Sequence, residues 1–176
     1  MLRQVKDIDE RVVDQLFGVY EESMADLAGG FASPGEMRAS YREYLEEFVS
    51  TPGQFVLVEE RDAVWASALR AVPFGEGRWF IEAVETAPAM RKQGCGHELL
   101  AHVLAFLRDK GADELCCIIA PENMASRRLH EGCGFVATDD APVNPWDELE
   151  EGCILYRCAI MGACRHVGRE WLAGRF

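Results

Sequence analysis

The sequence lacks an excess of positive charge. It has 18 Lys and Arg residues against 30 Asp and Glu residues, which gives a formal net charge of −12 at pH 7. Because neutralising nucleic-acid phosphates requires clustered Lys and Arg, this balance disfavours a nucleic-acid partner. It fits a cationic partner or substrate better, although the alternative is that the acidic residues only keep the chain in solution.

Long apolar runs are also missing. No uncharged stretch approaches the roughly 18 residues of a membrane span. The first ten residues, MLRQVKDIDE, hold no apolar segment typical of a signal peptide. Apolar residues still make up 49% of the chain, which disfavours a disordered protein. We therefore expect a globular, cytoplasmic protein with no membrane partner.

Paired cysteine motifs are missing as well, because none of the seven cysteines forms a CxxC pair. Cys116 and Cys117 are adjacent in an apolar run, where successive side chains of a strand point to opposite faces. We therefore expect no disulfide framework and a reducing compartment. Four residues near the end of the chain match no common zinc spacing, so we expect no metal site: Cys153, Cys158, Cys164 and His166.

Apolar periodicity and capping residues predict the order of helices and strands. Asp9 is expected to cap a helix that runs to about residue 27, and Ser33 a second helix with Pro34 at its first position. Two further helices are expected over residues 94–110 and 123–131. Strands are expected over residues 2–5, 54–59, 63–72, 78–86, 114–120, 135–138 and 153–160.

This order determines the expected fold class. Three strands run consecutively before the helix over 94–110, which argues against a doubly wound dinucleotide-binding fold. We expect one α/β domain over residues 1–176, with a mixed, mostly antiparallel sheet and helices on both faces. Residues 161–176 would form a C-terminal tail, which could be helical.

The segment that joins the strand over 78–86 to the next helix contains the sequence RKQGCGH. The first amides of a helix lack internal partners, and the helix dipole adds positive charge there, so a phosphate or pyrophosphate fits this place. Gly94 and Gly96 keep side chains away from it, and Arg91 and Lys92 add charge. The third glycine of a dinucleotide fingerprint is replaced by Leu99, and no P-loop Gly-Lys-Ser/Thr is present. Alone, the segment also fits a simple tight turn.

Two motifs together resemble the GNAT family of N-acetyltransferases. The first is Arg91-x-x-Gly94-x-Gly96 after a strand that ends Val84-x-Thr86-x-Pro88. The second matches the family pattern Asn-x-x-Ala-x-x-Leu-Tyr-x-x-x-Gly-Phe through Asn123, Ser126, Leu129, His130, Gly134 and Phe135. The resemblance is specific from about residue 80 to residue 136 and rests on element order elsewhere.

The resemblance implies an enzyme that moves the acetyl group of acetyl-CoA to an amine of a small molecule or peptide. Val84 and Thr86 would pair with the pantetheine arm through their backbones, Asn123 would meet that arm, and Ser126 would make a close contact. The strands over 78–86 and 114–120 would splay to let the thioester reach the acceptor. The pyrophosphate would lie on Arg91, Lys92, Gln93, Gly94, Cys95 and Gly96, with His97 beside it.

Direct attack on the thioester needs an amine that has lost its proton, and a lysine-like amine has a pKa of about 10. Glu82 is the first candidate for the base, directly or through a water, and Glu85 is the second. Strand alternation places them on opposite faces unless a bulge intervenes. Each could instead only bind substrate. The family's Tyr acid is replaced by His130, which could protonate the thiolate or leave it to water.

The acceptor is expected between the first two helices and an acidic loop that precedes the last strand. Trp146 and its acidic neighbours in that loop could attract an ammonium group, or could simply be solvated. The sequence is compatible with a monomer or a homodimer. An alternative function is a non-catalytic acyl-CoA-binding sensor or interaction module, which the missing Tyr at position 130 supports.

Overall fold

The computed structural model describes residues 1–160, and the predicted tail over 161–176 lies outside the described residues. Within residues 1–160, seven strands form one sheet in the order β1-β2-β3-β4-β5-β7-β6, and only β4 and β5 pair in parallel. The strands are β1 (Leu2–Val5), β2 (Phe55–Arg61), β3 (Val64–Pro73), β4 (Arg78–Thr86), β5 (Glu114–Ile119), β6 (Val136–Ala137) and β7 (Ile154–Ala159).

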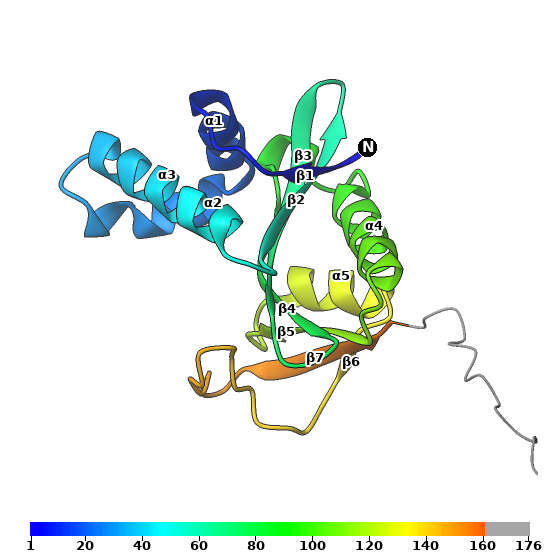
Figure 1. Cartoon of the computed structure of the whole chain (residues 1–176). Helices are drawn as coiled ribbons and strands as arrows, with labels where there is room; N and C mark the ends of the chain where they lie inside the picture. The colour runs from blue at the N-terminus through cyan, green and yellow to red at the C-terminus, as the bar shows by residue number, and fades with distance from the viewer. Residues whose placement is uncertain (161–176) are drawn as a thin grey trace, which may run out of the picture.

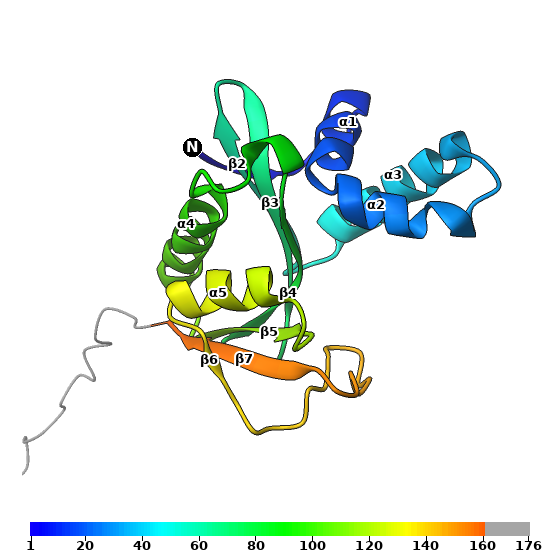
Figure 2. The same ribbon diagram turned by 180° about the vertical axis from the view of Figure 1, so that it is seen from behind.

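The helices lie on both faces of this sheet. One face carries α1 (Glu10–Val19), α2 (Glu21–Leu27) and α3 (Pro34–Ser50), and the other carries α4 (Cys95–Asp109) and α5 (Met124–Gly132) (Figures 1 and 2). This arrangement confirms the predicted mixed, mostly antiparallel α/β fold. Within residues 1–160, no helix is long and apolar enough to span a membrane.

Burial of apolar side chains on both faces of the sheet produces two cores. Cys116 packs with the helices α1 and α3, whereas Cys117 packs on the α4 side. The strand over 114–119 is therefore buried on both faces, as predicted. The cysteines of the described part of the chain are free.

The first predicted helix is two helices. Residues 9–27 were expected to form one helix, but the backbone leaves helical geometry at Tyr20, with φ −93° and ψ 27°. The break places the ring of Tyr20 inside the core, where the guanidinium of Arg70 lies 4.5 Å from its centroid. Local periodicity could not reveal this break, because the partner of Tyr20 is fifty residues away in the sequence.

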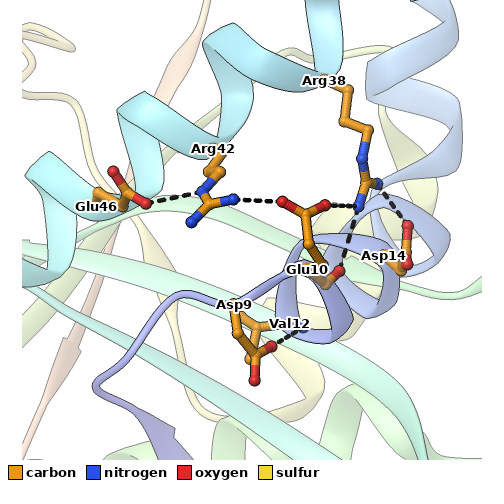
Figure 3. A network of polar contacts seen from close by, with 7 residues as sticks. All are labelled: Asp9, Glu10, Val12, Asp14, Arg38, Arg42 and Glu46. Carbon is orange, nitrogen blue, oxygen red and sulfur yellow. Dashed lines mark hydrogen bonds and ion pairs between the residues drawn. The ribbon is translucent and has the colours of Figure 1, made fainter. Parts of the chain in front are cut away.

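Charged side chains join α1 to α3 (Figure 3). Glu10 of α1 pairs with Arg38 and Arg42 of α3, and Arg42 also binds Glu46 at 2.8 Å. Each exposed pair contributes little by itself, because water and salt screen the two charges. These ion pairs and the buried face of α3 hold this helix in place. The helix carries Tyr41 and Tyr44, which belong to the site described below.

A bulge in β4 decides which way its side chains point. Arg70 of β3 pairs with Ala83, and the next residue, Ala71, pairs with Ile81, so Glu82 is an extra residue without a register partner. An inserted residue shifts the alternation of a strand by one. Glu82 contacts Arg70, and Glu85 accepts a hydrogen bond from Ser23 of α2. Both carboxylates therefore face the α1–α3 side of the sheet.

The strands β4 and β5 separate beyond their first residues. Their pairing covers only Arg78–Phe80 against Glu114–Cys116, while β4 continues to Thr86. The expected splay is therefore present. It leaves the backbone of the second half of β4 unpaired on its β5 side, next to the turn that begins α4.

Candidate functional site

A cleft of about 820 Å³ follows the second half of β4. Its walls come from α2, β4, the turn before α4, and the start of α5. The predicted site residues that line it are Glu82, Val84, Glu85, Thr86, Arg91, Lys92, Gly94, Cys95, Gly96, His97, Asn123 and Ser126. Gln93 and His130 do not line it. The Gln93 side chain instead donates to the Ala89 carbonyl oxygen at 3.0 Å.

The two glycines of the turn have different structural roles. Gly94 caps α4 in the left-handed region with φ +83°, and a Cβ there would have no heavy atom within 4 Å. The residue before the helix therefore borders open space, and no side chain caps the helix, which leaves the first helical amides for an anion. A Cβ on Gly96 would lie 3.2 Å from Leu129 and 3.3 Å from Thr86. Gly96 is thus explained by close packing of α4 against β4 and α5.

We expect Gly94→Ala to destabilise the protein by about 1–2 kcal/mol, because alanine pays the steric cost of the left-handed region. Gly18→Ala is the matched control, since Gly18 lies inside α1 with no heavy atom within 4 Å of the added Cβ. It should stabilise the protein by about 0.5–1 kcal/mol. Urea unfolding of both variants measures the difference, and equal effects would contradict the proposed backbone role of Gly94.

Arg91 connects the turn to α2. Its guanidinium binds both carboxylate oxygens of Glu22 at 2.6 and 2.8 Å, and its Nε donates to the Thr86 carbonyl oxygen at 3.2 Å. The hydrogen bond from Arg91 lowers the pKa of Glu22. Sequence reasoning missed Glu22. Its spacing of four residues from Asp26, which lines the same cleft, was the available signal.

A second cavity of about 260 Å³ lies between α2, α3, β3 and β4. Its lining is mostly apolar and aromatic: Met24, Leu27, Phe31, Met37, Ser40, Tyr41, Tyr44, Arg70 and Glu82. Of these residues, Glu82 alone also lines the large cleft. The two cavities therefore meet at this carboxylate.

Arg70 holds Glu82 in place. Arg70 is only 8% exposed, and its Nε and Nη2 donate to the two carboxylate oxygens of Glu82, the second at 3.3 Å. Its Nη1 donates to the Tyr41 hydroxyl at 3.3 Å, and the guanidinium lies 5.3 Å from the Tyr44 ring centroid. Sequence reasoning missed Arg70, although a charged residue inside an apolar strand was a visible signal.

The second carboxylate, Glu85, has a different environment. It is half-buried, accepts a hydrogen bond from Ser23, and its Oε2 atom has no partner among residues 1–160. Burial raises the pKa of Glu85, and the bond from Ser23 offsets part of this effect. A raised carboxyl pKa suits a general base, but Glu85 lines only the large cleft.

His130 lies in the interior at 1% exposure and lines neither cavity. Its Nδ1 is 2.8 Å from the Ser126 carbonyl oxygen, and its ring meets Phe135 edge-on at 4.9 Å between centroids. A carbonyl oxygen only accepts, so Nδ1 carries the proton and Nε2 of the neutral ring carries none. Burial lowers the pKa of His130, and the hydrogen bond to the Ser126 carbonyl offsets part of this effect by raising it. This geometry does not favour a proton donor, and the acid role stays a prediction.

The lowered pKa predicts how stability depends on pH. The unfolded chain takes up a proton at His130 near the usual pKa of about 6.5, before the folded protein does. This contribution to stability is present above pH 6.5 and is lost as the pH falls below it. Urea midpoints at pH 7.5 and 5.5 should therefore differ more for the wild type than for His130→Phe. His97→Phe, which removes an exposed imidazole, should retain the wild-type difference.

The acidic loop before β7 lines neither of the two cavities. Asn144 organises it by donating to Glu148 and Glu150 at 3.1 and 3.0 Å, and Asp140 pairs with Arg157 at 2.9 Å. Trp146 is 56% exposed at its tip. Among residues 1–160, no group of three or more His, Cys, Asp or Glu is placed to hold a metal ion.

Comparisons with known proteins identify a family and several relatives of this chain. The family model for the "Acetyltransferase (GNAT) family" matches residues 19–135. Aminoglycoside N(6')-acetyltransferases type 1 of Salmonella typhimurium and Serratia marcescens are 32% and 35% identical over 60 residues, which cover 34% of this chain and 41% of each relative. The match thus spans less than half the length of these curated relatives.

Solved structures with the same fold can be superimposed on most of the chain. The PaiA N-acetyltransferase from Thermoplasma acidophilum, in complex with coenzyme A, has a TM-score of 0.67 at 15% identity and covers 90% of this chain and 99% of its own. The ribosomal-protein-alanine N-acetyltransferase from Brucella melitensis has a TM-score of 0.67 at 20% identity, with coverages of 90% and 99%. At these identities the likeness concerns the fold alone.

Proposed function

The chain belongs to the GNAT acetyltransferase family, and on that basis we propose that it transfers the acetyl group of acetyl-CoA to an amine. The observation that carries the proposal is that Glu82 lines both cavities. The larger cavity ends at the turn that begins α4, whose first amides would hold an anion, and so suits acetyl-CoA, whereas the smaller one suits the acceptor. A carboxylate at the junction of the two cavities would contact the amine in one cavity and lie next to the thioester of acetyl-CoA in the other.

The large cleft offers coenzyme A a site for each of its parts. The amides that open α4 and the charge of Arg91 and Lys92 would hold the pyrophosphate. The unpaired edge of β4 would accept the pantetheine as an added strand, through the backbones of Val84 and Thr86. Asn123 accepts a hydrogen bond from the Ser126 amide at 3.0 Å, which orients its carboxamide in the cleft.

The chemistry then uses Glu82 as base. A carboxylate has about four acceptor positions; Arg70 occupies two and the Tyr44 hydroxyl donates towards a third, so a position remains for the amine or for a bridging water. Glu82 removes the ammonium proton, and the nitrogen attacks the thioester carbonyl carbon. The carbon–sulfur bond breaks, and the proton that the nitrogen still carries in excess passes through water to the leaving thiolate. Glu85 is the second candidate base, because its pKa is raised.

The proposal also covers the charge of the acceptor, the location of the enzyme and its oligomeric state. A free amine is cationic at neutral pH, and a chain with a net charge of −12 would attract it. The curated relatives are named for aminoglycosides, which are amines of this kind. We also propose a cytoplasmic, one-domain enzyme, monomeric or homodimeric, that binds neither nucleic acid nor membranes.

The test follows release of the coenzyme A thiol from acetyl-CoA in the presence of a panel of primary amines, together with calorimetry of acetyl-CoA binding. We expect binding and amine-dependent thiol release. Tight binding without turnover on any amine would overturn the enzyme and favour the sensor hypothesis. Absence of binding would overturn both, because each needs the cleft to hold acetyl-CoA.

A further inference from the structure

We infer that the 260 Å³ cavity holds the apolar, ring-sized body of a monoamine, with its amino group at Glu82. This inference rests on the proposed function and names its acceptor class. It concerns a cavity that the two predicted motifs do not contain, since its walls come from α2, Phe31, α3, β3 and Glu82 of β4. The curated relatives, named for aminoglycosides, are the natural contrast.

The walls of the cavity favour an aromatic or aliphatic body. Tyr41 and Tyr44 stack with centroids 6.3 Å apart at an interplanar angle of 17°. Phe31 and Leu27 contribute to the same lining, and Leu27 is 57% exposed although it is apolar. Apolar side chains left open beside a few convergent polar groups are typical of a small-molecule site. A ring placed among these side chains gains burial and aromatic contacts.

The charges of the cavity limit the acceptor to one amino group at this end. Arg70 and Glu82 pair through two hydrogen bonds, so their charges compensate each other. The other polar side chains of the lining are Ser40 and the two tyrosines, none of them acidic at neutral pH. A second ammonium group would therefore lie against apolar walls or near Arg70. Burying an unpaired charge is costly, so a polycation does not fit.

The size of the cavity agrees with this limit. Its volume of about 260 Å³ lies below the roughly 300–1,000 Å³ of pockets that enclose drug-sized ligands. One ring with a short chain fills this volume, whereas the further amino-sugar rings of an aminoglycoside would lie outside the apolar walls. The amino group of such a molecule would reach Glu82, where the cavity joins the cleft.

The experiment compares initial rates of thiol release from acetyl-CoA with 2-phenylethylamine, 1,4-diaminobutane and kanamycin. We expect kcat/KM to be at least about 10-fold higher for 2-phenylethylamine, in line with the 10–200-fold selectivity of apolar pockets. 2-Phenylethanol, which lacks the amine, should inhibit competitively with respect to 2-phenylethylamine. That readout needs no variant and so does not depend on folding of a mutant.

A substitution in the cavity wall tests whether this cavity causes the preference for 2-phenylethylamine. Phe31→Ala should raise KM for 2-phenylethylamine about 10-fold and leave KM for acetyl-CoA unchanged. Val64→Ala shortens an exposed apolar side chain at the start of β3 that lines neither cavity, so it should change neither constant. Preference for the diamine or kanamycin, or an unaffected Phe31→Ala, would overturn the inference but leave an acetyltransferase. Acetyl-CoA binding without acetylation of any amine would instead remove the proposed function, and the inference with it.

Discussion

Glu82→Gln should lower kcat/KM for the amine acceptor by about 10²–10⁴-fold, the usual contribution of a positioned general base. Glutamine has nearly the same shape and still accepts a hydrogen bond from Arg70, but it cannot remove a proton. Because the carboxylate lies where the two cavities meet, the loss should appear after binding. Stopped-flow thiol release at saturating acetyl-CoA measures the rate, and calorimetry should show unchanged acetyl-CoA affinity.

Glu85→Gln is the matched control, since Glu85 lies on the same strand and faces the same side. It should lower kcat/KM much less, because Glu85 does not line the smaller cavity. The reverse order would assign the base to Glu85. In that case the pH–rate profile should also have an acid limb above the usual carboxyl pKa, because burial raises the pKa of Glu85.

Arg70→Met is expected to reduce the free energy of unfolding by about 1.5–3 kcal/mol, the contribution of hydrogen bonds to a charged group, because the Glu82 side chain left behind is 22% exposed. Methionine retains an apolar chain of similar length, so the loss isolates the charge. Arg70 also packs against the rings of Tyr20 and Tyr44, with the guanidinium 4.5 and 5.3 Å from their centroids. Urea unfolding followed by circular dichroism measures the change.

The double variant Arg70→Met/Glu82→Gln separates the contribution of the ion pair from that of Arg70 packing against the aromatic rings. Once the carboxylate is neutral, removal of the guanidinium leaves no unpaired charge, so much of the lost stability should return. A coupling energy of about 0.5–3 kcal/mol is expected for residues in contact. Additive effects would show that Arg70 and Glu82 act independently, and would remove the argument that Arg70 positions the base.

The sequence by itself determined the local structure. Asp9 accepts a hydrogen bond from the Val12 amide at 2.8 Å, and Ser33 from the Glu36 amide at 3.1 Å, as their capping positions predicted. The strand over Arg78–Thr86 has the predicted bounds, and α4 begins at the residue after Gly94. These features depend on neighbours a few residues apart, so the sequence pattern contains them. The two motifs indicated the family for the same reason.

Tertiary structure alone decided how the catalytic candidates are arranged. The bulge that turns Glu82 and Glu85 to one face depends on the register between β3 and β4. The pairing of Glu82 with Arg70 and the second cavity require α2 and α3 to pack over that strand. The burial of His130 likewise comes from α5 lying against the sheet. Each depends on contacts between residues far apart in the chain, which no local pattern records.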